Sequence, residues 1–275
     1  MGTVSKAEKA AYNDEVKDIK REVEQIKKSI NEAAAKKKKH PNIANYYNLE
    51  LASHEMDAIE NFIKMNDLSL EMLNLRNSTF LENARKEFYK VLQYLEEIVG
   101  NQVDRSLKEN DEYLATIKEI NPQQILNFVK RMHRILGELI RNFGQDTKWK
   151  WSFVEWQARA AVITKNITSF SDVARLRDPR TPFFYDRRDM MLLCKDSLTE
   201  AAKQFRTKYE MAGKARDDLK SSISYLAALR KIHVLFGEDV EATKLKNIID
   251  AAKMALEADD KAKDKDKKEK EQKGK

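Results

Sequence analysis

The scarcity of glycine and proline is the feature that most restricts how this chain can fold. Only 7 glycines and 4 prolines occur in 275 residues, whereas an average composition would supply roughly 12% of such residues. Folds rich in β-strands need a turn signal about every 8–12 residues, and Rossmann or P-loop nucleotide folds need glycines clustered near a strand end. Neither pattern occurs, so long helices are expected.

The balance of charged and hydrophobic residues narrows the helical class further. Charged residues make up 35% of the chain and hydrophobic residues 41%, and the mean hydropathy is −0.70. A chain this polar keeps enough apolar side chains for one stripe on each helix, which is typical of amphipathic helices and less typical of a thick core. We therefore expect an all-α, elongated protein with long antiparallel coiled-coil-like helices and a small helical bundle.

The clearest apolar pattern lies near the N-terminus, where hydrophobic residues recur at alternating spacings of four and three, as in a coiled-coil seam. The seam residues are Tyr12, Val16, Ile19, Val23, Ile26 and Ile30. Four lysines at 36–39 and then Pro41 follow them; cations suit a helix C-terminus, and proline stops a helix. Because so narrow a seam contacts one or two partner helices, residues 1–40 are predicted to form a coiled-coil arm that takes part in assembly.

Residues 41–120 are predicted to form long helical segments. The stretch 42–99 contains neither glycine nor proline, and a capping box at Thr79-x-x-Glu82 marks a point where a second helix can begin. One helix and two helices both fit this stretch. A shorter and more polar helix is expected over 100–120.

Residues 121–256 are predicted to form a helical bundle. Its start is marked by Asn121 as a cap and by a proline in the first helical position. The proline-containing segment 178–182 must be non-helical. A long apolar run over 186–236 includes Gly213, which either kinks the helix or is tolerated within it at about 1 kcal/mol relative to alanine.

The formal net charge of +7 is unevenly distributed. Residues 148–188 hold nine lysines or arginines against four acidic residues, a surplus of +5. The C-terminal stretch 257–275 is nearly neutral and contains no hydrophobic residue larger than alanine, so it is expected to be a disordered charged tail. A local positive surplus permits binding to an anionic partner without requiring it.

Four histidines and one cysteine supply few groups for catalysis. His40, His54, His133 and His233 fall outside the Glu-x-x-His pairs of di-iron bundles and outside the His-Glu-x-x-His zinc motif. Cys194 cannot form an internal disulfide, and its apolar neighbours predict a small buried hydrophobe. We therefore expect no catalytic residue, no metal site and no cofactor, and we predict that the protein is not an enzyme.

One segment combines aromatic and cationic residues to an unusual degree. Residues 148–178 are expected to form a helix whose first turns hold all three tryptophans, and arginines and aromatics recur around the proline segment that follows. The candidate binding residues are Trp149, Trp151, Phe153, Trp156, Arg177, Arg180, Phe183, Phe184, Tyr185, Arg187 and Arg188. They fit a junction where helices pack, a protein-binding hot spot, or a surface where bases stack on rings and cations meet phosphates.

These patterns favour a non-enzymatic structural or assembly protein, such as a helical scaffold or a filament-associated component. It would act through protein partners, including other copies of itself. The alternative is a helical protein that binds RNA or DNA through 148–188. No apolar run approaches the 18 residues of a membrane span, and no signal-peptide h-region is present. The sequence as it stands predicts a cytoplasmic protein, with the periplasm as the alternative if a signal peptide has been removed.

Overall fold

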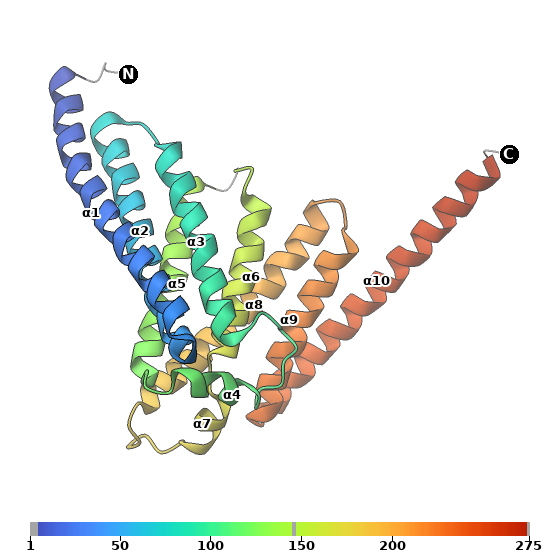
Figure 1. Ribbon diagram of the computed structural model, residues 1–275. Helices are drawn as coiled ribbons and strands as arrows, with labels where there is room; N and C mark the ends of the chain where they lie inside the picture. The colour runs from blue at the N-terminus through green and yellow to red at the C-terminus, as the bar shows by residue number, and fades with distance from the viewer. Residues whose placement is uncertain (1–4, 145–146, 274–275) are drawn as a thin grey trace.

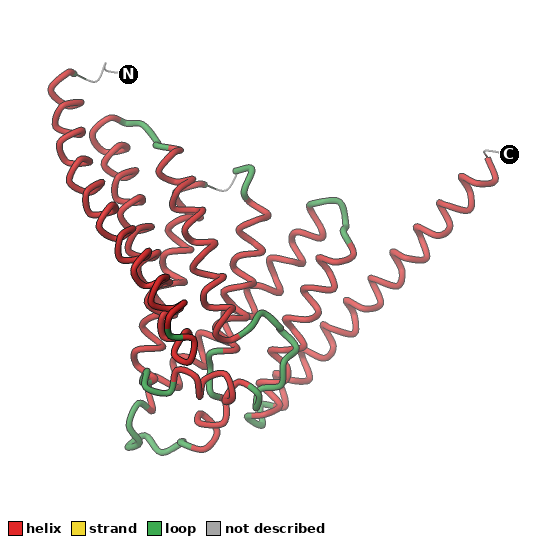
Figure 2. Tube along the Cα trace, viewed as in Figure 1, coloured by secondary structure: helices red, strands yellow, loops and turns green. Residues whose placement is uncertain are grey.

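The computed structural model describes residues 5–144 and 147–273, with side chains up to residue 258. Within these ranges the chain forms ten α-helices, two short 3-10 helices and no strand, which confirms the all-α prediction (Figures 1 and 2). The elements are α1 Lys6–Lys39, η1 Pro41–Ile43, α2 Ala44–Leu73, α3 Ser78–Val99, α4 Asn110–Leu114, η2 Ala115–Ile117, α5 Pro122–Phe143, α6 Lys150–Asn166, α7 Phe170–Arg175, α8 Phe184–Met211, α9 Arg216–Leu235 and α10 Asp239–Lys273.

The longer helices spread like a fan from one end of the molecule, which holds α4 and α7 (Figure 1). Helices α1, α2 and α3 pack side by side on one flank, and α8, α9 and α10 on the other. Helix α6 lies between the two groups, since it contacts α3 and α5 as well as α8. We call the end of the molecule that carries α4, η2, α7 and the start of α8 the α7 end.

The helix boundaries follow local capping chemistry. Asn121 is the cap of α5, as predicted, and it forms a capping box with Gln124. The stretch 42–99 forms two helices, and the second begins slightly earlier than the sequence indicated. Its cap is Asn77, whose side chain accepts a hydrogen bond from the Phe80 amide at 3.2 Å. Thr79 therefore lies inside the first turn of α3 and is not its cap.

The structure corrects the helix predicted over 100–120. Gly100 ends α3 with a positive φ of 71°, and a Cβ at this position would collide with the Arg105 side chain. The following residues are turns and irregular backbone until the five-residue helix α4. The polar composition of this segment reflects a loop that crosses the α7 end.

The second half of the chain also breaks into more helices than its apolar pattern indicated. The helix predicted over 148–178 stops after α6 and resumes as the short α7. The run over 186–236 turns back on itself at Gly213 and Lys214, both with positive φ, so that α8 and α9 form a hairpin. Gly213 thus lies in the turn that ends α8 and does not kink a continuous helix.

Helix α10 corrects the disorder predicted for 257–275 over most of that stretch. It continues as helix to Lys273 and extends past the ends of its neighbours (Figure 1). Ala242, Ile249 and Ala252 are buried on its first half, where it packs along α9. The later residues lack core-forming side chains but are rich in lysine and also include alanine and glutamate, which are good helix formers.

The seam of α1 is closed by helices of the same chain. Tyr12, Val16, Ile19 and Val23 are buried in one core cluster with residues of α2 and α3, and Ile26 packs against that cluster. Lys37 near the C-terminus of α1 forms an ion pair with Glu97 of α3. Helix α1 is therefore not an open arm, because its apolar stripe already has its partner helices.

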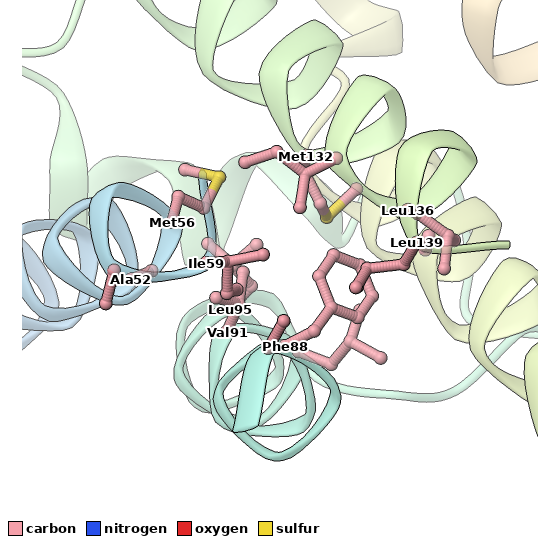
Figure 3. Close-up of a cluster of buried hydrophobic side chains, with 14 of the residues drawn as sticks. Ala52, Met56, Ile59, Phe88, Val91, Leu95, Met132, Leu136 and Leu139 are labelled. Atoms are coloured by element: carbon pink, nitrogen blue, oxygen red, sulfur yellow. The ribbon is translucent and has the colours of Figure 1, made fainter. Parts of the chain in front are cut away.

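The largest core cluster joins α2, α3 and α5 beneath α1. Figure 3 shows these helices presenting apolar side chains to a common centre. The labelled residues are Ala52, Met56, Ile59, Phe88, Val91, Leu95, Met132, Leu136 and Leu139. A second cluster, formed by α6, α7, α8 and α9, lies on the other side of α6.

We predict that replacing Val23 with alanine lowers the free energy of unfolding by about 1–3 kcal/mol, because a buried side chain is truncated and leaves a cavity. Chemical denaturation of the full chain measures this change. Glu22→Ala, at an exposed site one residue away, is the control and should change stability by no more than about 0.5 kcal/mol. Equal stability of the two variants would show that α1 does not belong to the core.

A carboxyl group is buried where α2 meets α3. Glu55 is 1% exposed and accepts a hydrogen bond from Lys90 at 3.3 Å, while Lys90 also pairs with Glu87. Burial and the neighbouring Glu87 raise the pKa of Glu55 to about 7. The folded protein therefore binds a proton more tightly at this site than the unfolded chain does.

This proton makes stability depend on pH. The unfolded Glu55 titrates near its ordinary pKa of 4.5 and the folded one near 7, so the free energy of unfolding should fall as pH rises between these values. Glu55→Gln should remove this slope and stabilise the protein at pH 8 by about 1–3 kcal/mol. Denaturation at pH 5 and pH 8 measures both effects, with the exposed Glu22→Gln as control. A steeper slope in the Glu55→Gln variant would contradict the assignment.

Candidate functional site

The tryptophan-rich half of the predicted binding segment packs against the protein interior. Phe153 and Trp156 are buried in the first core cluster, and Trp151 packs against the second. The Trp149 indole donates a hydrogen bond to Glu82 of α3 at 2.6 Å, and the Arg85 guanidinium lies 3.8 Å from the centre of its ring. These side chains hold α6 to the rest of the fold and present little free aromatic surface.

The two halves of the segment do not form one patch. The tryptophans lie at the start of α6, and the arginine-rich stretch 177–188 follows its other end, at the α7 end of the molecule (Figure 1). Trp149 caps the start of α6, whose 17 residues span about 25 Å at 1.5 Å per residue, and Trp156 lies in its second turn. The single Trp/Arg junction expected from the sequence is therefore not formed.

The arginine half does form a recess of its own, which we call the arginine hollow. It encloses about 290 Å³ and is lined by Val173, Leu176, Arg177, Phe184, Arg187, Arg188, Met191, Phe236 and Glu238. Four of the predicted residues thus meet, while three others lie outside the hollow. Arg180 pairs with Asp178 in the exposed loop. Phe183 and Tyr185, which follow this loop in the chain, are exposed.

Glu238 is the acidic residue of the arginine hollow, and the sequence analysis did not single it out. Its carboxylate accepts hydrogen bonds from Lys195 at 2.6 and 2.7 Å and also contacts the His233 ring. Although burial raises the pKa of Glu238, these two partners hold it below its ordinary value. Glu238 is therefore ionised and already neutralised by α8 and α9.

Arg187 also lines a second hollow, which we call the large hollow. It encloses about 530 Å³, and its apolar floor is formed by Leu114, Ala115, Ile117, Ile120, Ile125, Ile167, Val173 and Met190. Asp111, Asp172, Asp186 and Lys118 are among its polar lining residues. An apolar floor with a few convergent polar groups is the usual character of a binding pocket.

A third hollow of about 780 Å³ lies on a further side of α7. Leu107, Phe170, Val234 and Leu235 supply its apolar lining. Helix α7 thus contributes residues to all three hollows, although it is only six residues long. Helix α4, η2, the start of α5, neighbouring loops and the ends of α8 and α9 complete these hollows. The apolar periodicity of single helices does not predict which of these segments come together.

A buried polar network holds the loop of the α7 end in place. The Asn110 side chain donates to the Lys165 carbonyl at 2.8 Å and to the Thr168 carbonyl at 3.0 Å. The Lys165 ammonium donates to the Arg105 carbonyl at 3.1 Å and to the Asn166 side chain at 3.0 Å. Burial lowers the pKa of Lys165 to about 8. These bonds tie the segment after α3 to the C-terminal end of α6.

Arg187 stands between the large hollow and the arginine hollow and lines both. Its side chain donates from Nη2 to the Pro182 carbonyl at 2.8 Å, but among the described residues its Nε has no acceptor. The residue is 8% exposed, and no carboxylate in the described part of the chain pairs with it. Burying a guanidinium without a counter-ion is costly, so such a residue marks a candidate binding site.

The single cysteine lies away from these hollows in the second core cluster. Cys194 is fully buried, which confirms its prediction as a small core residue. Burial raises the pKa of its thiol to about 12. The thiol is therefore protonated at neutral pH and poorly suited to act as a nucleophile.

In the described part of the chain, none of the helices combines the length and apolar character that crossing a membrane requires.

Comparison with known proteins places the chain in a family. The chain matches no curated protein and no solved structure. The model of the TP0443 family matches residues 8–260, which span most of the sequence. The chain therefore belongs to the TP0443 family.

Proposed function

We propose that this protein works by binding other proteins, and that its partner docks at the α7 end. The observation that carries the proposal is the grouping of three hollows around one six-residue helix, with the unpaired Arg187 between two of them. Exposed aromatic side chains lie next to this site, and Tyr185 is 59% exposed. Arginine and tyrosine are enriched among the residues that dominate protein–protein binding.

A structural or assembly role is the form of this function that we favour. The partner is either a second copy of the chain or another protein. The support comes from the α7 end and no longer from α1, whose seam is occupied within the chain. Asn110 and Lys165 anchor the loop that lines the third hollow, and a preformed surface lowers the entropic cost of binding.

RNA or DNA binding through 148–188 is less well supported. Base stacking needs accessible rings, and Phe153 and Trp156 are buried. The arginines of the α7 end also have Asp111, Asp172 and Asp186 as neighbours in the adjoining large hollow. These carboxylates would repel a phosphate backbone that follows the surface.

Site-specific photocrosslinking tests the proposed docking face. Tyr185→p-benzoylphenylalanine, in cells that make the protein, should yield a discrete crosslinked product, because the exposed ring lies within the docking face. The same probe at Glu22, an exposed position on α1, is the control and should yield none. Mass spectrometry of the product identifies either a second copy or a different protein.

Two results would contradict this proposal. One is an equal pattern of products from both probe positions, which would mean that the α7 end is not favoured. The other is a product at Tyr185 that nuclease digestion removes, which would support the nucleic-acid alternative. A product that survives nuclease and contains a crosslinked peptide from a second polypeptide supports the proposal.

A further inference from the structure

The charges that line the arginine hollow are strongly unbalanced. Arg177, Arg187 and Arg188 contribute three positive charges, and Glu238 contributes one negative charge. Glu238 is engaged by Lys195 and His233, and Arg188 pairs with Asp189. Arg177 and Arg187 are therefore the lining arginines that pair with no carboxylate of the described residues. The hollow therefore has a positive potential, which its apolar walls strengthen by keeping water away.

The hydrogen bonds of the three arginines leave donors available. Arg177 donates from Nε to the Ala174 carbonyl at 2.9 Å, and Arg188 donates to Asp189 at 3.3 Å. Arg187 uses one nitrogen for the Pro182 carbonyl, and its buried Nε has no acceptor among the described residues. A guanidinium has five N–H donors, so each arginine keeps donors beyond these bonds.

The backbone next to the hollow adds to the same potential. Phe183 precedes α8 with φ of 60°, a strained conformation for a bulky residue, and its side chain makes no capping bond to the helix. The 28-residue helix α8 therefore begins without a capping side chain for its first amides. A helix N-terminus favours negative charge. Asp186 in the same first turn offsets part of this potential, and Arg187 also lies within this turn.

The walls of the hollow restrict the kind of anion that fits. Phe184, Met191 and Phe236 are apolar and face the same space as the arginines. A volume of about 290 Å³ is at the lower limit of pockets that enclose whole small molecules. It suits one acidic side chain with an apolar neighbour better than a free cofactor.

We propose that the arginine hollow binds a carboxylate side chain from an acidic segment of the partner protein, with Arg187 as its main contact. A carboxylate can accept two parallel hydrogen bonds from one guanidinium, which would satisfy the orphaned Nε of Arg187 and a neighbouring nitrogen. Arg177 and Arg188 add charge from the rim. This inference rests on the proposed function and names the chemistry that the partner presents.

The test uses the full chain and the probe peptide acetyl-Glu-Phe-Glu-Leu-amide, with acetyl-Gln-Phe-Gln-Leu-amide as the uncharged match. The readout is the Nε–Hε nuclear magnetic resonance signal of Arg187, assigned from its loss in Arg187→Lys. The Glu peptide should shift this signal in a saturable way and the Gln peptide should not. Added sodium chloride should weaken the binding because it screens the charges.

Substitutions in the hollow should then report which arginines carry the interaction. Because Arg187→Gln lacks the reporting signal, isothermal titration calorimetry measures peptide binding to each variant. Arg187→Gln should weaken Glu-peptide binding by about 30-fold or more, the loss expected when one member of a buried ion pair is removed. Arg188→Gln, at an exposed rim position, should weaken it by a smaller factor and keeps the test valid if Arg187→Gln does not fold. Arg206→Gln, on the exposed face of α8 where it pairs with Glu210, is the matched control and should leave binding unchanged.

Several outcomes would overturn the inference. If the two peptides bind equally, the affinity comes from apolar contacts and not from the carboxylates. If neither peptide shifts the Arg187 signal, the arginine hollow is not the binding site. If inorganic phosphate shifts the Arg187 signal and the Glu peptide does not, the hollow binds phosphate and not a carboxylate side chain. If crosslinking at Tyr185 still captures a protein while the Glu peptide fails, the proposed function stands and this inference falls.

Discussion

The burial of α6 on both sides is the packing constraint on which the rest of the structure depends. Phe153, Trp156 and Ile163 join the cluster shared with α1, α2, α3 and α5, while Val154 and Ala161 join the cluster shared with α7, α8 and α9. A helix that is apolar on both sides must lie inside a protein. Helix α6 thus links the flank of α1–α3 to the flank of α8–α10, and a direct contact between α5 and α8 adds to this link. Each of the other helices buries one apolar stripe, and together with α6 these stripes form one connected core.

The same helix explains where the candidate site lies. The C-terminal end of α6 buries polar groups, among them the Lys165 ammonium and the Asn166 amide, which bond to the backbone of the loop after α3. Such groups are costly to bury unless they are satisfied, and satisfying them fixes the loop and α7 in one arrangement. Several helices end at this place, and short segments held by hydrogen bonds lie between them. The hollows around α7 are the spaces left between these segments and the helix ends. Arg187 is the exception, since its Nε is buried at the centre of this region and has no partner among the described residues.

Local signals predicted some boundaries well and others poorly. The Asn121 capping box was recognised from its own residues because capping depends on neighbours within three positions. The turn at Gly213 was not predicted, because glycine costs a helix too little to end it unless packing favours a reversal. The arginine-rich segment was identified as a binding candidate, but Glu238 and Phe236 reach the same hollow from the turn after α9. No sequence spacing relates residues that far apart.

The amino-acid sequence was enough to establish an all-α protein, the stripe along α1 and the burial of Cys194, because composition and periodicity act within a few residues of each position. Tertiary packing settled which helices cover that stripe, where the long apolar runs reverse, and which cationic residues share a hollow. Those outcomes depend on contacts between segments far apart along the chain, and on the balance between apolar burial and the cost of enclosing charge. That is why the α1 seam, which in the sequence resembles an open arm, is part of the core. It is also why Trp149 and the arginines of the same segment lie toward opposite ends of α6.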